Sequence, residues 1–364
     1  MRKNNISRRK FIGTATVAAV GSSLLRLPDI YGKISEPKPQ KSIVSIVRVK
    51  DGNVAKAVEE SIDLLGGINS LTKNINRILL KPNLVAPDLN CTTKPEVVRT
   101  IAQLLLNSGK DVMIGEASAA ADSFNVIGNE TYRTKKKEIL DRMQKHVFDT
   151  LGYTELAKSL NIPLINLHSG DIIEVPLNEG YAAKSLKIHR VLSEVDLVCS
   201  VPMMKTHTLA TVTLAMKNLI GLYPGTEYYS VRSWLHDRAA ESGSVGVAYE
   251  VIDMNRAVKT GLSVIDATTA MEGDGPFGGK LVDLGLIIAG TSPLAADMVG
   301  SILMGFELNE IPAITLAHKA GMVPVSLEDI EIRGLTIDET RRRFIRPNVA
   351  KWMDINKFWG VKEI

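Results

Sequence analysis

Apolar runs alternate with stretches of helical periodicity along the first part of the chain after residue 42. Runs rich in β-branched residues predict strands, and apolar positions three and four apart predict helices. Asn53 stands where a helix N-cap is expected, and two glycines follow that helix as a stop signal. In order, the pattern predicts a strand at 43–49, a helix at 53–65, a strand at 77–80, a helix at 94–107 and a strand at 111–114. This order predicts a parallel sheet with right-handed crossovers.

The middle of the chain interrupts this order, and the second half resumes it. Helices are predicted at 135–151 and 153–160, followed by short strands around Leu164, Ile172 and Leu186, which together form an insertion or cover. The later elements are strands at 196–201, 262–266, 284–288 and 329–332, an apolar segment at 209–222, and helices at 245–258, 293–304 and 310–320. The fold class predicted is α/β, a mostly parallel sheet flanked by helices, and the pattern leaves open two lobes that meet near residue 200.

The first 32 residues have the order of charged and apolar residues that is typical of a targeting segment. The motif Ser-Arg-Arg-Lys-Phe-Ile-Gly at 7–13 precedes a mild apolar run at 14–25, and this run is too short to span a bilayer. The motif resembles a twin-arginine (Tat) signal, so we expect export of the folded protein to the periplasm or another extracytoplasmic space, with the twin-arginine translocase as a transient partner. No A-x-A cleavage site precedes Tyr31, which leaves open a retained signal that tethers the protein to the membrane.

The remaining domain boundaries follow from composition. Residues 33–42 carry the prolines and lysines of a linker, residues 43–334 form the folded domain, and residues 335–364 form a C-terminal extension. The first 32 residues hold six Lys and Arg against one acid, and the rest of the chain holds 38 bases against 39 acids. This near-neutral balance, with no basic stripe, argues against nucleic acid as a partner.

Two cysteines, Cys91 and Cys199, are the only thiols in the sequence. Two thiols cannot form a disulfide framework or supply the four thiolates of a ferredoxin-type cluster, so no iron–sulfur cluster is expected. Cys199 lies within an apolar run that predicts a buried strand, where a cysteine behaves as a small hydrophobic residue.

Polar residues follow the predicted strands at the points where these strands end. Lys81 and Asn83 follow the second strand, and Glu116 follows the third. Because ligands of parallel α/β sheets bind beyond the carboxyl ends of the strands, these side chains are candidates for one site. Thr93 precedes a helix with proline in its first turn and is a candidate N-cap, with an anion site at that helix start as a further option.

The densest group of polar residues lies in the segment 202–221, directly after a buried strand. Lys205 and His207 follow that strand, and a helix over 211–219 would place Thr213 and Lys217 on one face. Lys217 lies in an apolar context, where an amine either extends to water or meets an anion. Thr211 and Asn218 are further candidates to orient a ligand in this segment.

A glycine-rich segment at 271–280 contains the spacing G-x-G-x-x-G, but its context argues against dinucleotide binding. A proline interrupts the motif, and the segment leads into another strand and not into a helix. The sequence still allows a tight loop here that brings Glu272 and backbone amides toward a ligand. His236, Asp237 and Asp297, the last within an apolar helix, complete the candidates. The sequence lacks a His-x-x-x-His pair and a nucleophile elbow, so neither a metal site nor a serine hydrolase has a specific motif here.

Five segments resemble, in order and spacing, the bacterial and archaeal family called domain of unknown function 362 (DUF362). They are LLKPNLV, TTKPEVVRTIAQLLLNSGKDVMIGEA, DLVCSVPMMKTHTLATVTLAMKNLIGLYPG, MEGDGPFGG and PLAADMVGSILMG, and the resemblance covers roughly residues 43–334. It implies no defined activity, because the family is defined by sequence. Some members carry an appended four-cysteine segment like that of ferredoxins, and this chain has none. A looser likeness at scattered positions to the lactate racemase family, which handles small hydroxy acids with a nickel cofactor, is an analogy about fold and substrate size only.

Two hypotheses of function follow. In the first, the protein is an exported enzyme of the isomerase or lyase type that acts on a small carboxylate or phosphate metabolite. In the second, it is a non-catalytic periplasmic protein that binds a small anion. For the enzyme, the candidates for acid/base chemistry or for holding a divalent metal are His207, Glu116 and Glu272. The candidate ligand-binding residues are Lys81, Asn83, Thr93, Lys205, Thr211, Lys217 and Asn218.

Overall fold

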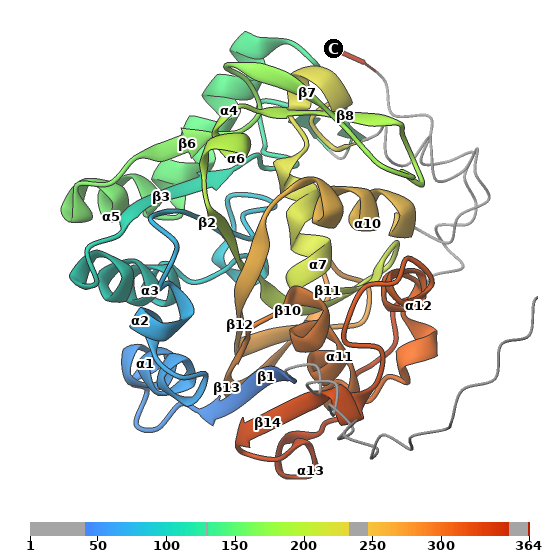
Figure 1. The fold of residues 1–364 in the computed structure, drawn as a ribbon. Helices are drawn as coiled ribbons and strands as arrows, with labels where there is room; N and C mark the ends of the chain where they lie inside the picture. The colour runs from blue at the N-terminus through green and yellow to red at the C-terminus, as the bar shows by residue number, and fades with distance from the viewer. Residues whose placement is uncertain (1–40, 129, 233–246, 349–362) are drawn as a thin grey trace, which may run out of the picture. The chain divides into compact units, whose positions relative to one another are not determined.

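The computed structural model describes residues 41–128, 130–232, 247–348 and 363–364 (Figure 1). The predicted signal segment, 1–32, and all but the last two residues of the predicted linker lie outside the described residues. His236 and Asp237 also lie outside them. Within the described part of the chain, no helix combines the length and the apolar character needed to cross a membrane.

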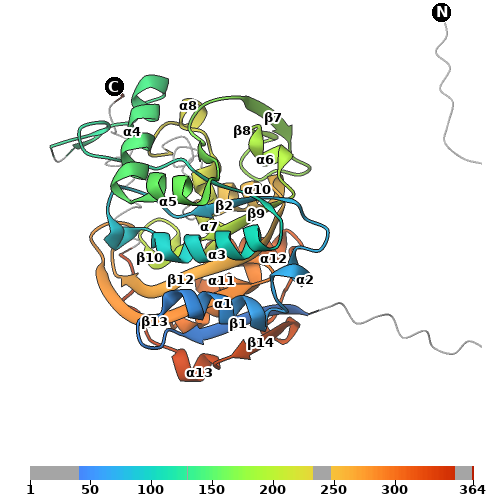
Figure 2. The ribbon, with the colours of Figure 1, turned by 90° about the vertical axis from the view of Figure 1, so that its left-hand side faces the viewer.

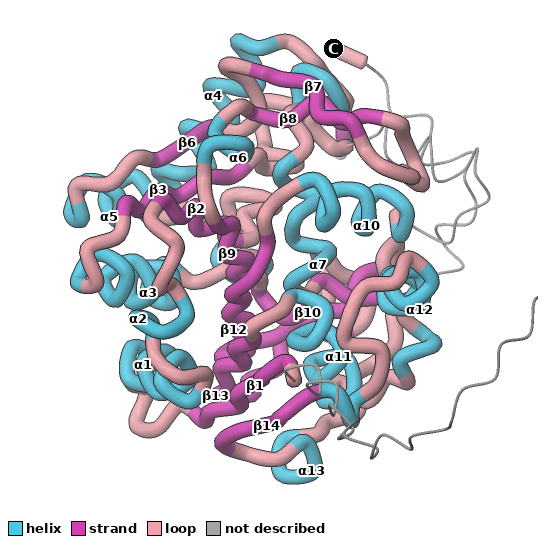
Figure 3. The backbone as a smooth tube through the Cα atoms, in the orientation of Figure 1, coloured by secondary structure: helices cyan, strands magenta, loops and turns pink. Residues whose placement is uncertain are grey.

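A ten-stranded sheet forms the centre of the fold (Figure 3). The order of its main strands is β14 (Ile330–Gly334), β1 (Ser42–Arg48), β13 (Lys280–Gly290), β12 (Thr260–Glu272), β9 (Leu197–Val201), β2 (Arg77–Pro82), β3 (Asp111–Glu116) and β6 (Leu164–Asn166). Strand β10 (Met203–His207) pairs with β12 and with the short β11 (Thr211–Thr213). Strand β13 runs antiparallel to both of its neighbours and β11 runs antiparallel to β10, whereas the other pairs are parallel. The predicted α/β fold with a mostly parallel sheet is confirmed.

Helices cover both faces of this sheet, because its buried strands are apolar on both sides. In β2, Ile78 and Leu80 belong to one hydrophobic core and Leu79, between them, belongs to the other. One face is covered by α1 (Val54–Leu64), α3 (Pro95–Asn107), α4 (Lys137–Thr150) and α5 (Tyr153–Leu160). The other face is covered by α7 (Ala215–Asn218), α10 (Ala248–Ala257), α11 (Pro293–Leu303) and α12 (Pro312–Lys319). Figure 2 shows α1 and α3 in front of the strands.

The predicted insertion is in part an extension of the sheet. Strand β6 joins the edge beside β3, whereas β7 (Ile172–Pro176) and β8 (Ser185–His189) form a separate hairpin. Strands from both sides of residue 200 belong to the same sheet, and the described residues belong to one compact unit. The described residues therefore show no division into lobes near residue 200. The smaller elements are α2 (Ile68–Leu71), α6 (Val191–Glu194), α8 (Gly225–Tyr228), α13 (Ile337–Thr340), and the pair β4 (Val126–Ile127) and β5 (Glu130–Thr131).

Two local predictions were wrong, because these segments pair with or bind other parts of the chain. The segment 211–219 is not one helix: Thr211 has φ 67° at the turn between β10 and β11, and only Ala215–Asn218 are α-helical. Thr93 is not the N-cap of α3, because its hydroxyl donates to the Val201 carbonyl (2.6 Å) and accepts from the Asn83 amide (2.9 Å). The predicted N-cap of α1 is confirmed, since the Asn53 side chain accepts from the Lys56 amide.

Candidate functional site

A cavity of about 290 Å³ opens at the carboxyl ends of β2, β3 and β10. Six of the residues predicted from the sequence line it together: Lys81, Asn83, Glu116, His207, Lys217 and Asn218. Arg232 and Asp274 are the other charged side chains among its lining residues. Residues from both halves of the chain therefore lie around one cavity.

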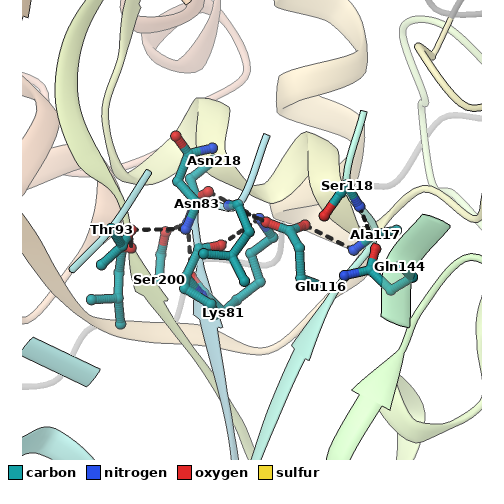
Figure 4. Close-up of polar contacts among 12 residues, drawn as sticks. Lys81, Asn83, Thr93, Glu116, Ala117, Ser118, Gln144, Ser200 and Asn218 are labelled. Carbon is teal, nitrogen blue, oxygen red and sulfur yellow. Dashed lines mark hydrogen bonds and ion pairs between the residues drawn. The ribbon is translucent and has the colours of Figure 1, made fainter. Parts of the chain in front are cut away.

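Lys81 and Glu116, both in the cavity lining, form a buried ion pair (Figure 4). The Lys81 ammonium donates to Glu116 Oε2 (2.7 Å), to Asn218 Oδ1 (2.9 Å) and to the Pro82 carbonyl (2.8 Å). These three bonds use all three donors of the ammonium. Burial lowers the pKa of Lys81, and the neighbouring carboxylate of Glu116 opposes this shift. Lys81 therefore fixes the architecture of the site and has no donor left for a ligand.

Both oxygens of the Glu116 carboxylate are also engaged. Its Oε1 accepts from the Ala117 amide (2.9 Å), and its Oε2 accepts from the Leu84 amide (2.8 Å) as well as from Lys81. Asn218 completes the network by donating to the Lys81 carbonyl (2.8 Å) and to Ser200 Oγ (3.1 Å). These bonds tie the end of β2, the end of β3 and α7 into one rigid cluster.

Gly221 allows this cluster to form, because its backbone passes directly over the ion pair. A Cβ atom on Gly221 would lie 2.2 Å from Glu116 Oε1 and 2.5 Å from Lys81 Nζ. Both distances are far shorter than any real contact of a Cβ atom. The glycine in the sequence Leu-Ile-Gly-Leu is thus required by close approach and not by backbone conformation, since its φ is not positive.

Asn83 presents an unused acceptor within the site. Its side chain is only 6% exposed, and its Oδ1 has no hydrogen-bond partner among the described residues. Its backbone amide is held by Thr93 Oγ1, which anchors the turn after β2. A buried amide oxygen without a partner is costly, so the geometry is suited to a ligand that supplies a donor.

Lys217 lies on the cavity wall in α7, and Asp297 fixes the start of this short helix. Asp297 Oδ1 accepts from the Ala215 amide (2.6 Å) and its Oδ2 accepts from the Met216 amide (3.0 Å). The Lys217 side chain remains partly exposed, and no residue in the described ranges forms a hydrogen bond or ion pair with its ammonium. Desolvation, assisted by the positive charges of Lys205, Lys81 and Arg232, lowers the pKa of Lys217 to about 7.

Arg232 adds a third cation to the cavity lining, and the sequence analysis missed it. Its guanidinium donates to the carbonyls of Ser118 (3.3 Å), Ser230 and Ala117, which hold the planar group in place. Burial lowers the pKa of Arg232 only to about 10, so it stays charged at neutral pH. No strand end or helix start precedes Arg232 in the sequence, and its backbone has φ 57°, so no local pattern marked it.

His207 closes β10 and faces the same cavity as a neutral imidazole. Its Nδ1 accepts from the amides of Leu209 (3.0 Å) and Ala210 (3.2 Å), so the ring hydrogen is assigned to Nε2. The glycine-rich loop packs against this strand, since the Gly275 carbonyl accepts from the Thr208 amide (3.0 Å) and hydroxyl (3.0 Å). Pro276 and Phe277 of the loop also line the cavity.

Four predicted site residues do not line the cavity: Thr93, Lys205, Thr211 and Glu272. The Lys205 ammonium is buried and donates to the Cys91 carbonyl (2.6 Å), and burial lowers its pKa to about 8. Glu272 accepts from the Ile345 amide (3.1 Å) and lies 3.8 Å from Arg342, so it binds the C-terminal segment. Cys91 is buried as well, and burial raises the pKa of its thiol to about 11.

The sequence left open whether the protein binds a divalent metal. Within the ranges that the structure describes, no group of three or more His, Cys, Asp or Glu side chains is arranged to hold a metal ion. We therefore assign no metal ligands.

Comparisons with solved structures find chains that match part of this one at low sequence identity. The lactate racemase apoprotein from Thermoanaerobacterium thermosaccharolyticum matches 74% of this chain and 58% of its own length, with 12% identity and a TM-score of 0.44. A protein from Thermotoga maritima matches 61% of this chain and 51% of its own length, with 15% identity and a TM-score of 0.34. This chain thus spans little more than half of either one, and a likeness at this level carries no argument about activity.

Sequence comparisons identify a curated relative and a family. A thylakoid-associated protein of Synechocystis sp. is 26% identical over 291 residues, which cover 78% of this chain and 81% of the relative. The family model for a domain of unknown function, DUF362, matches residues 78–301, which is more than half of the chain and includes every predicted site residue. The chain therefore belongs to the DUF362 family.

Proposed function

We propose that the protein is an enzyme that binds a small carboxylate or phosphate metabolite in this cavity and moves a proton on it. The observation that carries the proposal is Lys217, an amine on the cavity wall without a partner among the described residues. Three cations, Lys205, Lys81 and Arg232, act on it against the single carboxylate of Glu116. An anion placed beside Lys217 and Arg232 would offset this excess of positive charge.

The same residues favour catalysis over simple capture. A lysine with its pKa near the working pH is typical of a functional site, where proton exchange is useful. His207 adds an imidazole ring to the cavity wall, a group suited to acid/base chemistry, and two backbone amides hold its Nδ1. The Lys81–Glu116 pair is assigned to architecture, because the three donors of Lys81 and both oxygens of Glu116 already have partners.

The test is a melting series of the full chain with phosphate, glycerol phosphate, lactate and malonate. A ligand present at about 100 times its dissociation constant should add about 2.7 kcal/mol to the free energy of unfolding. Lys217→Met should lose most of this gain, whereas Lys205→Met, which removes a buried cation away from the cavity wall, should keep most of it.

The result also separates the two hypotheses of function. One outcome is that a ligand stabilises the wild type, that this effect depends on Lys217, and that the bound ligand is not turned over. This outcome would favour the non-catalytic binding protein. If none of the four anions stabilises the wild type, or if both lysine variants respond as the wild type does, the anion site is wrong.

A further inference from the structure

We infer that Lys217 is a nucleophile that forms an imine with the carbonyl group of a small 2-oxo acid bound in the cavity. This inference rests on the proposed function and names the substrate class of the same site. It depends on how the cations around the cavity differ in their hydrogen-bond partners, because these partners determine which side chain can react.

The three cationic side chains that line the cavity are engaged to different degrees. Lys81 has used all three of its donors, and Arg232 is clamped by three backbone carbonyls. Lys217 is the lining cation for which the described residues offer neither a hydrogen bond nor an ion pair. An amine needs a free lone pair and a free approach to attack a carbonyl carbon, and the other two cations lack both.

The surroundings of Lys217 also keep its amine in the reactive, neutral form. A lysine desolvated beside other cations loses its proton more readily than one in water, and this is a recognised route to an activated amine. At Lys217 both effects act together. Burial makes the largest contribution to the lowered pKa, and the positive charges of Lys205, Lys81 and Arg232 lower it further. The permanent charge of Arg232 remains to hold the carboxylate while the amine is neutral.

The lining groups match the two ends of a 2-oxo acid. Arg232 supplies positive charge for the carboxylate, and Lys217 supplies the amine for the carbonyl group. The cavity of about 290 Å³ is at the small end of the range for ligand pockets, which suits an acid of a few carbon atoms.

The chemical step balances without any further reactant. The lone pair of Lys217 Nζ attacks the carbonyl carbon, a C–N bond forms, and the carbonyl oxygen takes up a proton to give a carbinolamine. The C–O bond then breaks, the oxygen leaves as water, and a C=N bond forms as the nitrogen gives up its hydrogens. The imine draws electrons from the adjacent carbon, which acidifies a C–H bond or weakens a C–C bond there.

The test is reductive trapping of the full chain with pyruvate and sodium borohydride at neutral pH. Trapping should add the mass of pyruvic acid less one oxygen atom to the intact protein, and peptide mapping should place this mass on Lys217. Its yield there should exceed that at an ordinary exposed lysine by more than about tenfold, because an amine with an unshifted pKa is almost entirely protonated at neutral pH.

Lys217→Arg is the matched variant, since it keeps a positive charge on α7 but cannot form an imine. It should lose the trapped adduct and still be stabilised by lactate and phosphate in the melting series. If lactate or phosphate stabilises the wild type but pyruvate leaves no adduct on Lys217, or if Lys217→Arg is trapped to the same extent, the nucleophile is wrong and the anion site stands. If no anion stabilises the wild type, the proposed function fails, and the imine falls with it.

Discussion

At the residue scale, the site depends on which polar atoms have partners and which do not. Lys81 and Lys217 both line the cavity, yet one is locked into a network and the other lacks any partner among the described residues. Position relative to the strand ends marked both as candidates, but the sequence could not separate their roles. That separation depends on Glu116 and Asn218, which reach Lys81 from 35 and 137 residues away along the chain.

The close approach of Gly221 to the ion pair gives the first prediction. Gly221→Ala should lower the free energy of unfolding by about 1–3 kcal/mol, because the new methyl group must push Lys81 and Glu116 out of place. Chemical denaturation of the purified variant measures this. Gly300→Ala in α11 is the control, since the nearest atoms are the flexible ends of Leu214 at 3.3 Å and beyond. Equal stability of Gly221→Ala and wild type would contradict the packing described.

The lowered pKa of Lys217 gives a second prediction, on the pH dependence of stability. The folded-state pKa of about 7 lies below the ordinary value of 10.5, so between these values the unfolded chain binds more protons. The cost of burying the charged amine is therefore fully present below pH 7 and fades as the pH rises toward 10.5. Lys217→Met should be more stable than wild type by roughly 1–3 kcal/mol near pH 6, less than the full shift implies because the side chain is partly exposed.

This advantage of Lys217→Met should shrink markedly by about pH 9.5, where the wild-type amine is neutral in the folded state. Urea denaturation midpoints at the two pH values measure the difference. Lys56→Met, at an exposed position on α1, is the control for the loss of a surface lysine. An advantage that is constant over this range, or that grows with pH, would exclude a depressed pKa at Lys217.

At the scale of elements, the order of strands and helices could be predicted, but the segment that carries the site could not. Elements such as β2 and α5 could be predicted because the spacing of their apolar residues is a local property of the sequence. The segment from Thr211 to Asn218 has a helical pattern of apolar residues, yet β10 draws Thr211–Thr213 into a strand pair. Asp297 then starts α7 at Ala215 from 82 residues away, a contact that no local pattern contains.

Asp297 gives the third prediction, because it fixes the helix that carries Lys217 and Asn218. Asp297→Asn replaces one acceptor by a donor that faces a backbone N–H, so it should cost about 1–3 kcal/mol of stability. It should also weaken anion binding, since α7 loses its anchor. Both effects can be read from melts with and without lactate or phosphate.

Asp253→Asn is the matched control for this variant. Asp253 is also buried and accepts from the amides of Tyr181 (2.8 Å) and Ala182 (2.7 Å), but it does not line the cavity. It should lose stability to a similar extent and keep its response to anions. If both variants respond to anions alike, Asp297 has no role in positioning the site.

At the scale of the whole molecule, we propose that the protein is exported, which the sequence alone suggests. Replacing Arg8 and Arg9 together by Lys should trap the folded precursor in the cytoplasm, because lysine does not reproduce the planar guanidinium group. Fractionation of cells and immunoblotting measure this, with Arg26→Lys in the same segment as the control. Unchanged export of the double variant would argue for another route.

The sheet also shows that the boundaries of the family match are not the boundaries of the folding unit. The match covers residues 78–301, whereas β1 and β14 lie outside it, and β1 pairs with the second half of β13, from Leu286 to Gly290. Asn348 and Ile345, also outside it, bind the acids on the glycine-rich loop beside the cavity. A fragment cut at the ends of the match would therefore leave β13 without its partner β1, and this bare edge could pair with other chains. The glycine-rich loop at the cavity would also lose the contacts that support it from outside.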